Sequence, residues 1–398
     1  MPKLPSDAPD APDVPDAAHA PDAPDARGAP DLPDLDAPCP RDATASSGAT
    51  DSSGLSGLFA SSASSASSAS SASSDATNTT DSADLSDAPD AAEAPRVERL
   101  RCGPFIAEIA PAIGGSLVSF YSAAAEGAPR RDWLRPADAA ALRAGSPLGM
   151  ASFPLVPWCN RIRDGRFVWA GRGIALAPDD DGTPHAIHGL GWQRPWRVTG
   201  RAEGLLDLAF EEHGEGAWPF PFTATQRYAL DASGLSVTLS VRNSGTGPMP
   251  VGIGHHPYFA HRRAGGGTRV TAQVGAMWLS DDELLPTTLS ASAAPVEALQ
   301  HGMCLDAFTL DNNFTGFGHA ARIDWPDGSS LQLVAEAPLD HFVLYTPAEH
   351  DFFVMEAVSN CTDWLNLRHA AAPESLGGAV LEPGASITAT TRFLPALR

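Results

Sequence analysis

The sequence lacks the long apolar runs that a membrane-spanning helix requires. None of its stretches approaches about 20 apolar residues in a row. Its first residues, MPKLPSDAPD, also lack the apolar core of about 7 to 15 residues that a secretory signal contains. We therefore expect no membrane partner, with the cytoplasm as the default location.

Cysteine is scarce and irregularly spaced. The chain has five cysteines, none in a Cys-x-x-Cys pair, and their spacing does not match that of a disulfide-dense secreted domain. We expect reduced thiols, with the four cysteines after residue 95 packed as small hydrophobic side chains.

Runs of Lys or Arg are absent, as are glycine-rich phosphate loops between a strand and a helix. The chain carries 26 basic and 48 acidic residues, for a net charge of −22. Because nucleic-acid binding needs a basic surface, we expect no nucleic-acid partner. Without a phosphate loop there is also no sequence signal for a nucleotide cofactor.

The first 95 residues differ in composition from the rest. They repeat units such as APDAPD and SSASSASSASSA and hold 17 acids against 3 bases, so their charge is 3 − 17 = −14 and −8 remains for the other 303 residues. With few aromatic or β-branched residues, this segment cannot bury a core, and we predict a disordered tail over 1–95. A solvated linker, a mis-assigned start in a GC-rich reading frame, a tethering spacer and an acidic recognition arm are the interpretations left open.

Residues 96–398 consist of short β-type segments separated by Gly, Pro, Asn and Asp. In LSVTLSVRN, apolar and polar residues alternate with the period of a half-buried strand. Helical periodicity is clearest in PADAAALRAG, where Asp138 or Pro136 suits a helix start and Gly145 a helix end. We predict one all-β domain, a large antiparallel sandwich or barrel. The predicted strands include 105–111, 116–122, 205–212, 235–243, 331–336, 341–347 and 351–358.

Two segments carry side chains suited to proton transfer. Glu356 lies among apolar residues in FFVMEAVSN, and burial without a cation would raise its pKa and make it a better general base. Exposure on an edge strand, or pairing with an arginine, is the alternative. His255 and His256 open HHPYF, and strand alternation allows at most one of them to face a site. That histidine is either a hydrogen-bonded core residue or, beside aromatic rings, part of a sugar site.

The segment HAIHGLGWQRPW offers His185, His188 and Trp192. A His-x-x-His pair can bind zinc, but the following glycines disfavour a helix and no third ligand is evident, so we expect no metal. Packing of the tryptophans and a substrate-binding loop are the other interpretations, of which we favour the loop.

Two further segments supply polar candidates. WCNRIRDGRF places Asn160 and Arg161 before an Asp164-Gly165 pair typical of a hairpin turn. The guanidinium of an arginine suits sugar hydroxyls or a carboxylate, although a solvated hairpin arginine fits the pattern equally well. LDNNFTG adds Asp311, which an Asx turn would also explain.

Taken in chain order, these segments resemble the aldose 1-epimerase (galactose mutarotase) family over about 96–398. The matching segments are IAPAIGGSLVSF, NRI with GRF, IHG followed by RPW, HPYF, LDNNF and a glutamate strand near the C-terminus. The resemblance implies a large antiparallel β-sandwich of the galactose mutarotase type. It also implies an isomerase that interconverts the α and β anomers of a free aldose by acid/base catalysis, with a small sugar as its partner and with neither metal nor cofactor.

The resemblance also assigns roles to individual residues. The family's general base falls on Glu356 and its general acid on His256. Glu356 would take the proton of the C1 hydroxyl while His256 protonates the ring oxygen O5, and ring closure would reverse both transfers. The expected substrate-binding residues are Arg161, His188 and Asp311 by motif, with Asn160 and Trp192 from the same segments.

The sequence leaves the substrate open. Ala260-His261 follow the Tyr-Phe pair where better-known family members have Asn-Leu. A hexose-6-phosphate epimerase of the same fold is one alternative, with Arg161, Arg163, Arg166 and Arg194 as a possible phosphate pocket. A non-catalytic sugar-binding protein is the other. The oligomeric state is not predicted.

Overall fold

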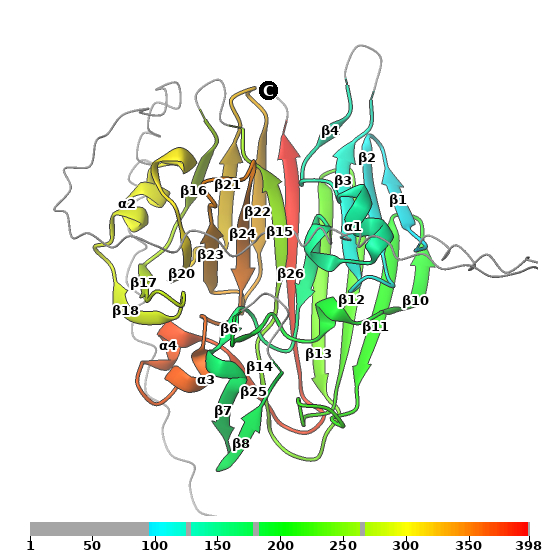
Figure 1. Ribbon diagram of the computed structural model, residues 1–398. Helices are drawn as coiled ribbons and strands as arrows, with labels where there is room; N and C mark the ends of the chain where they lie inside the picture. Colours follow the sequence, from blue (N-terminus) through cyan, green and yellow to red (C-terminus); the bar gives the residue numbers. More distant parts are fainter. Residues whose placement is uncertain (1–94, 125–128, 178–182, 263–266, 397–398) are drawn as a thin grey trace, which may run out of the picture. The chain divides into compact units, whose positions relative to one another are not determined.

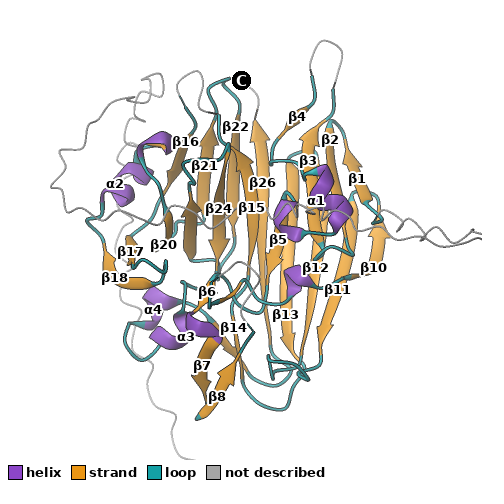
Figure 2. Cartoon of the chain, viewed as in Figure 1, coloured by secondary structure: helices purple, strands orange, loops and turns teal. Residues whose placement is uncertain are grey.

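The computed structural model describes residues 95–124, 129–177, 183–262 and 267–396. Strands dominate these residues, and the helices among them are short (Figure 2). No helix of the described residues is long and apolar enough to cross a membrane. The predicted tail lies, apart from residue 95, outside the described residues, so its disorder stays a prediction.

Two large antiparallel sheets form the described fold (Figure 1). The first has 11 strands in the order β1-β2-β3-β5-β15-β24-β23-β20-β17-β18, with β4 on β3. Its strands are β1 (Glu98–Cys102), β2 (Phe105–Ala110), β3 (Ser116–Ser122), β4 (Arg131–Asp132), β5 (Ser152–Leu155), β15 (Gly254–Ala260), β17 (Ala276–Ser280), β18 (Pro286–Ser290), β20 (Asp311–Thr315), β23 (His341–Tyr345) and β24 (Phe352–Val358).

The second sheet has nine strands in the order β10-β11-β12-β13-β26-β22-β21-β16-β19. They are β10 (Arg197–Ala202), β11 (Leu205–Glu212), β12 (Phe222–Asp231), β13 (Gly234–Asn243), β16 (Arg269–Ala272), β19 (Met303–Cys304), β21 (Ala320–Asp324), β22 (Ser330–Ala335) and β26 (Ser386–Ala396).

Short pairs and helices occupy the connections between these strands. The pairs are β6 (Arg161–Ile162) with β9 (Ala186–Ile187), β7 (Arg166–Trp169) with β8 (Arg172–Ala175), and β14 (Met249–Val251) with β25 (Ala379–Leu381). The α-helices are α1 (Ala139–Ala144), α2 (Ala294–Gln300), α3 (Trp364–Leu367) and α4 (Pro373–Leu376), and the 3-10 turns are η1 (Pro147–Gly149), η2 (Arg163–Gly165), η3 (Gly191–Gln193) and η4 (Leu305–Ala307).

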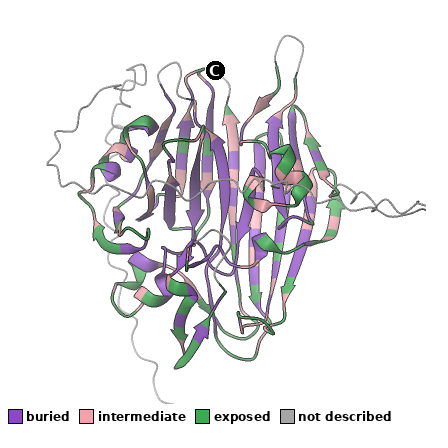
Figure 3. Cartoon of the chain, viewed as in Figure 1, coloured by how far each residue is buried: buried purple, intermediate pink, exposed green. Residues whose placement is uncertain are grey.

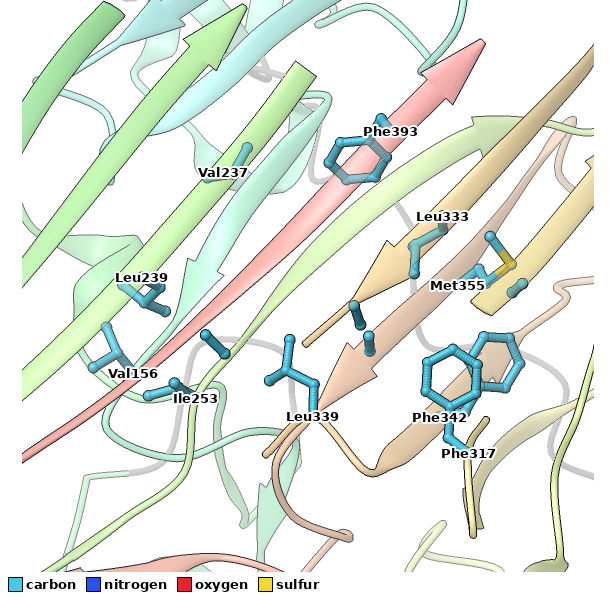
Figure 4. Close-up of a cluster of buried hydrophobic side chains, with 14 of the residues drawn as sticks. Val156, Val237, Leu239, Ile253, Phe317, Leu333, Leu339, Phe342, Met355 and Phe393 are labelled. Atoms are coloured by element: carbon cyan, nitrogen blue, oxygen red, sulfur yellow. The ribbon is translucent and has the colours of Figure 1, made fainter. Parts of the chain in front are cut away.

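One hydrophobic core is built from both sheets. Val237 and Leu239 of β13 belong to the same buried cluster as Phe342 of β23 and Met355 of β24 (Figure 4). The inner residues of each strand alternate with outward ones, as sheet-on-sheet packing requires. Each such side chain contributes roughly 1.5–3 kcal/mol when fully buried. The predicted all-β sandwich is therefore confirmed, and its strands are largely buried (Figure 3).

The opposite face of the first sheet carries a second, smaller cluster. Phe153 of β5, Tyr258 of β15 and Val354 of β24 belong to it, with Trp192 from η3. Because side chains alternate along a strand, the residues of β15 and β24 that face this cluster are not those that fill the main core. His256 and Glu356 lie on this second face.

Several local predictions are confirmed. Each of the predicted strands is present, with bounds that differ by at most two residues from those expected. The predicted helix is α1, which Asp138 caps through a hydrogen bond from the Ala140 N–H and which ends at Gly145 with φ of 67°. Local capping chemistry was enough to locate this helix.

Two expectations are wrong. Asp164 and Gly165 do have positive φ, but the strands on either side of them are not paired with each other: β6 pairs with β9, and β7 with β8. Tertiary pairing thus overrides the hairpin signal. Cys304 is disulfide-bonded, whereas Cys102, Cys159 and Cys361 are free, so the expectation of reduced thiols fails at Cys304.

Candidate active site

His256 and Glu356 lie opposite each other on adjacent strands. The β15–β24 register runs through Gly254↔Val358 and Tyr258↔Val354, which places His256 across from Glu356. Their side chains meet, with 3.3 Å between His256 Nε2 and Glu356 Oε1. Pro257 has no N–H to donate. The sheet thus brings two groups separated by about 100 residues into direct contact.

Burial shifts both groups toward their neutral forms. Glu356 is 2% exposed and lies on a central strand, so the edge-strand alternative is wrong. Desolvation, reinforced by the charge of Asp311, holds the pKa of Glu356 well above its ordinary value. Desolvation, with the charges of Arg135 and Arg161, lowers the pKa of His256 to about 3. Glu356 Oε2 and His256 Nδ1 are buried without hydrogen-bond partners among the described residues.

Aromatic rings fix the orientation of His256. Phe153, its neighbour on β5, stacks on the imidazole with ring centroids 4.6 Å apart and an angle of 15°. Trp192 stacks on Phe153 at 5.4 Å, and its Nε1 donates to the Gly189 carbonyl. Trp192 therefore supports Phe153 and through it the histidine, and its contact with a substrate stays a prediction.

Asn160 and His188 hold each other in strained conformations. Both have left-handed backbones, with φ of 59° and 61°. The Asn160 N–H donates to His188 Nδ1 at 3.2 Å, and the His188 N–H donates to the Asn160 carbonyl at 3.1 Å. Since Nδ1 accepts, Nε2 of His188 carries the proton. Burial keeps the pKa of His188 well below its usual value, so this ring is a neutral hydrogen-bond donor.

Arg161 and Asp311 form an ion pair whose charges act on Glu356. Arg161 Nη2 lies 3.1 Å from Asp311 Oδ2, and Arg161 is 5% exposed. Its Nη1 and backbone N–H both donate to Asn160 Oδ1. The solvated-hairpin alternative for Arg161 is therefore wrong. Asp311 begins strand β20 rather than forming an isolated turn, because DNNF pairs with β23.

Sequence reasoning missed three residues that shape the site. Phe153 lies in a four-residue strand without a distinctive pattern. Asn360 donates from Nδ2 to the carbonyls of Cys159 and Cys361, which ties the end of β24 to the loop carrying Asn160. Asn313 is buried, and its Oδ1 has no partner among the described residues. Strand alternation from Asp311 could have identified Asn313, because residues i and i+2 share a face.

The other candidates from the sequence lie elsewhere. His185 Nδ1 accepts from the Asp164 N–H at 3.1 Å, a structural contact. Arg163 pairs with Asp281 and Glu283, each at 3.3 Å. Arg166 and Arg194 are exposed. Of the four arginines considered for a phosphate pocket, Arg161 is thus the buried one, and it pairs with Asp311.

Known proteins resemble this chain in sequence. The sequence model of the aldose 1-epimerase family matches residues 107–394. The chain belongs to the aldose 1-epimerase family. The uncharacterised YphB protein of Escherichia coli K12 is 31% identical over 259 residues, which cover 62% of this chain and 86% of YphB.

Solved structures of the same type share the fold of this aldose 1-epimerase family member. A candidate aldose 1-epimerase from Escherichia coli K12 superposes with a TM-score of 0.66 at 27% identity, over 76% of this chain and 99% of the other. A galactose mutarotase-like protein from Clostridium acetobutylicum gives a TM-score of 0.66 at 18% identity, over 75% and 95% of the two chains. The antiparallel sandwich is therefore the family's fold.

Proposed function

We propose that this protein is an aldose 1-epimerase that interconverts the α and β anomers of an aldose by opening and closing its ring. The observation that carries the proposal is the contact between His256 and Glu356, 3.3 Å apart on adjacent strands. Binding alone does not require an acid and a base in contact at one buried point. Ring opening does, because O1 loses a proton while O5, bonded to the same carbon, gains one.

Glu356 must be a carboxylate and His256 must carry a proton before the ring can open. Burial raises the pKa of Glu356 and lowers that of His256, so it favours the neutral form of each group. In the proposed mechanism, a proton therefore passes from Glu356 to His256 Nε2 before ring opening. The positive charge of Arg161 stabilises the carboxylate that this transfer leaves.

The chemical steps then follow from the two protonation states. Glu356 takes the proton of the C1 hydroxyl, His256 gives its proton to O5, and the C1–O5 bond breaks to leave an open-chain aldehyde. After rotation about C1–C2, the aldehyde presents its other face to O5. The protonated Glu356 returns its proton to the carbonyl oxygen as His256 removes the one on O5, so each turnover restores the pair.

The neighbouring groups suit the binding of a sugar. His188 offers a neutral Nε2–H, and the Arg161–Asp311 pair offers a donor and an acceptor. Trp192 and Phe153 supply aromatic surface next to the histidine. Sugar rings need this combination, because they carry both hydroxyls and apolar C–H faces.

Anomer equilibration measured by polarimetry or NMR tests the proposal. Freshly dissolved α-anomers of several aldoses should equilibrate faster with the protein than in buffer. Glu356→Gln keeps the shape of the side chain but removes the base, and should lower kcat by ~10²- to 10⁴-fold while sugar binding persists. Glu374→Gln, on the exposed start of α4, should retain wild-type activity.

Two results would count against this function. Equilibration at the buffer rate across aldoses and sugar phosphates would leave a sugar-binding protein without catalysis. An active Glu356→Gln variant would mean that the base lies elsewhere.

A further inference from the structure

Arg135 is a cation on the same sheet face as His256 and Glu356. Its backbone N–H donates to the Tyr258 carbonyl at 2.9 Å, so it lies alongside β15. Its guanidinium carbon is 4.0 Å from the centre of the Tyr258 ring and 4.9 Å from that of Phe352. The Tyr258 ring is in turn 4.7 Å from the ring of His256. The Tyr258 ring thus links Arg135 to His256, whose pKa the charge of Arg135 also lowers.

Arg135 forms no ion pair with any carboxylate of the described residues. Its Nη2 donates only to neutral carbonyls, those of Met150 at 3.0 Å and Leu148 at 3.4 Å. Its Nε is buried without a hydrogen-bond partner among the described residues. Asp138 acts on Arg135 electrostatically, but its carboxylate caps α1 and forms no ion pair with the guanidinium. Burying an unpaired cation costs free energy, which a bound anion would offset.

The arginines near Arg135 are paired. It borders a surface cleft together with Arg130, Arg131 and Arg262. Arg130 lies 2.6 Å from Asp132, Arg131 lies 2.7 Å from Asp327, and Arg262 also pairs with Asp327. Arg161, across the site, pairs with Asp311. Among these five arginines, Arg135 is therefore the one whose guanidinium is not neutralised by a carboxylate of the described residues, and it is the one that we expect to bind an anion.

Substrate chemistry connects this capacity to the reaction. In the proposed function, on which this inference rests, His256 meets O5 of the sugar. O5 is bonded to C5, so the C5 substituent of a bound pyranose lies on the His256 side, toward Tyr258 and Arg135. We infer that Arg135 binds an anionic C5 substituent and makes the enzyme selective for hexuronates, whose C6 is a carboxylate.

The charge balance favours a carboxylate over a phosphate. One guanidinium matches one carboxylate with two parallel hydrogen bonds and neutralises its single charge. A phosphate monoester carries nearly two negative charges and would need a second cation. Arg163 is paired with acids, and Arg166 and Arg194 are exposed.

The test compares substrates within each variant, which cancels any loss of folded protein. The kcat/KM for anomerisation is measured with galacturonate, galactose and galactose 6-phosphate, and with the glucose series. In the wild type the uronate should exceed the neutral sugar by at least about tenfold, and Arg135→Gln should lower this ratio by about 10- to 100-fold. Arg135→Lys should restore part of it, and Arg166→Gln, at an exposed arginine, should leave it unchanged.

Each other outcome has a distinct meaning. If Arg135→Gln lowers uronate and neutral-sugar turnover equally, Arg135 has only a packing role and the inference is wrong. A wild-type preference for the 6-phosphate over the uronate also overturns it. If no sugar of the panel equilibrates faster than in buffer, the proposed function fails, and this inference fails with it.

Discussion

Adjacent histidines in β15 occupy different environments because neighbouring strand residues point to opposite faces. His256 meets Glu356, whereas His255 Nε2 lies 2.9 Å from Gln226 Oε1 on the second sheet. Gln226 Nε2 donates to the Gly115 carbonyl, as does the hydroxyl of Tyr228. His255 thus belongs to a hydrogen-bonded polar network between the sheets, where burial disfavours its charged form.

This network predicts sensitivity to acid. Burial lowers the pKa of His255 to about 4 in the folded state, against an ordinary value of 6.5. Between these values the unfolded chain binds more protons, so the free energy of unfolding falls as the pH drops from about 6.5 to about 4. The loss from this residue is about 3 kcal/mol. Urea unfolding across this pH range should show a smaller loss in His255→Gln than in the wild type.

An exposed histidine provides the control for this experiment. His213→Gln, which changes an exposed side chain, should show the full wild-type pH dependence. Equal slopes for His255→Gln and the wild type would mean that His255 contributes nothing to acid sensitivity.

At the scale of elements, the turn between β2 and β3 supports the site from a distance. Gly114 and Gly115 have φ of 61° and 60°. A Cβ on Gly114 would lie 2.1 Å from the Trp192 carbonyl oxygen, and one on Gly115 would meet the Trp196 ring at 2.8 Å. The η3 segment, whose Trp192 stacks on Phe153, therefore packs directly on this turn. The glycines of IAPAIGGSLVSF serve this contact.

Substitution of Gly114 should therefore disturb both stability and catalysis. Gly114→Ala combines left-handed strain with a backbone clash and should cost about 3 kcal/mol of unfolding free energy. Displacement of Trp192 should also lower kcat. Gly103→Ala, at φ of 54° with no atom within 4 Å of the new Cβ, should cost only about 1 kcal/mol and leave kcat unchanged. Similar effects of the two substitutions would exclude the proposed support of η3.

At the scale of the whole molecule, the site depends on long-range strand pairing. Strands β5, β15, β24, β23 and β20 are consecutive in the first sheet, although they span residues 152 to 358 of the chain. The phenylalanine, histidine, glutamate and aspartate of the site come from four of these strands. The site can therefore form only when this part of the sheet is assembled.

The position of the first strand predicts the effect of removing the N-terminal segment. The described strands begin at Glu98, and the family match covers 107–394. We propose that 96–398 is one domain, so deletion of residues 1–95 should leave folding and kcat/KM unchanged. Thermal unfolding and anomerisation rates of the two proteins check this. Both samples contain reductant, so that Cys304, which is disulfide-bonded in the structure, is reduced in each. Insolubility of the shorter protein would contradict the domain boundary.

The sequence by itself determined the features that depend on neighbouring residues. Alternation located the strands, and Asp138 and Gly145 located α1 because capping is a local interaction. Strand alternation also separated His255 from His256. The order of motifs identified the family, since each motif is a short local segment.

Only the tertiary structure decided how these segments meet. The pairing of β6 with β9 replaced the hairpin expected at Asp164, and strand register brought His256 to Glu356. Among the described residues, Arg135 has no ion-pair partner, because the nearby carboxylates pair with other arginines. No local sequence pattern predicts this distribution of ion pairs. Register and ion pairing depend on residues far apart in the chain, because the net gain of each contact depends on what folding buries around it.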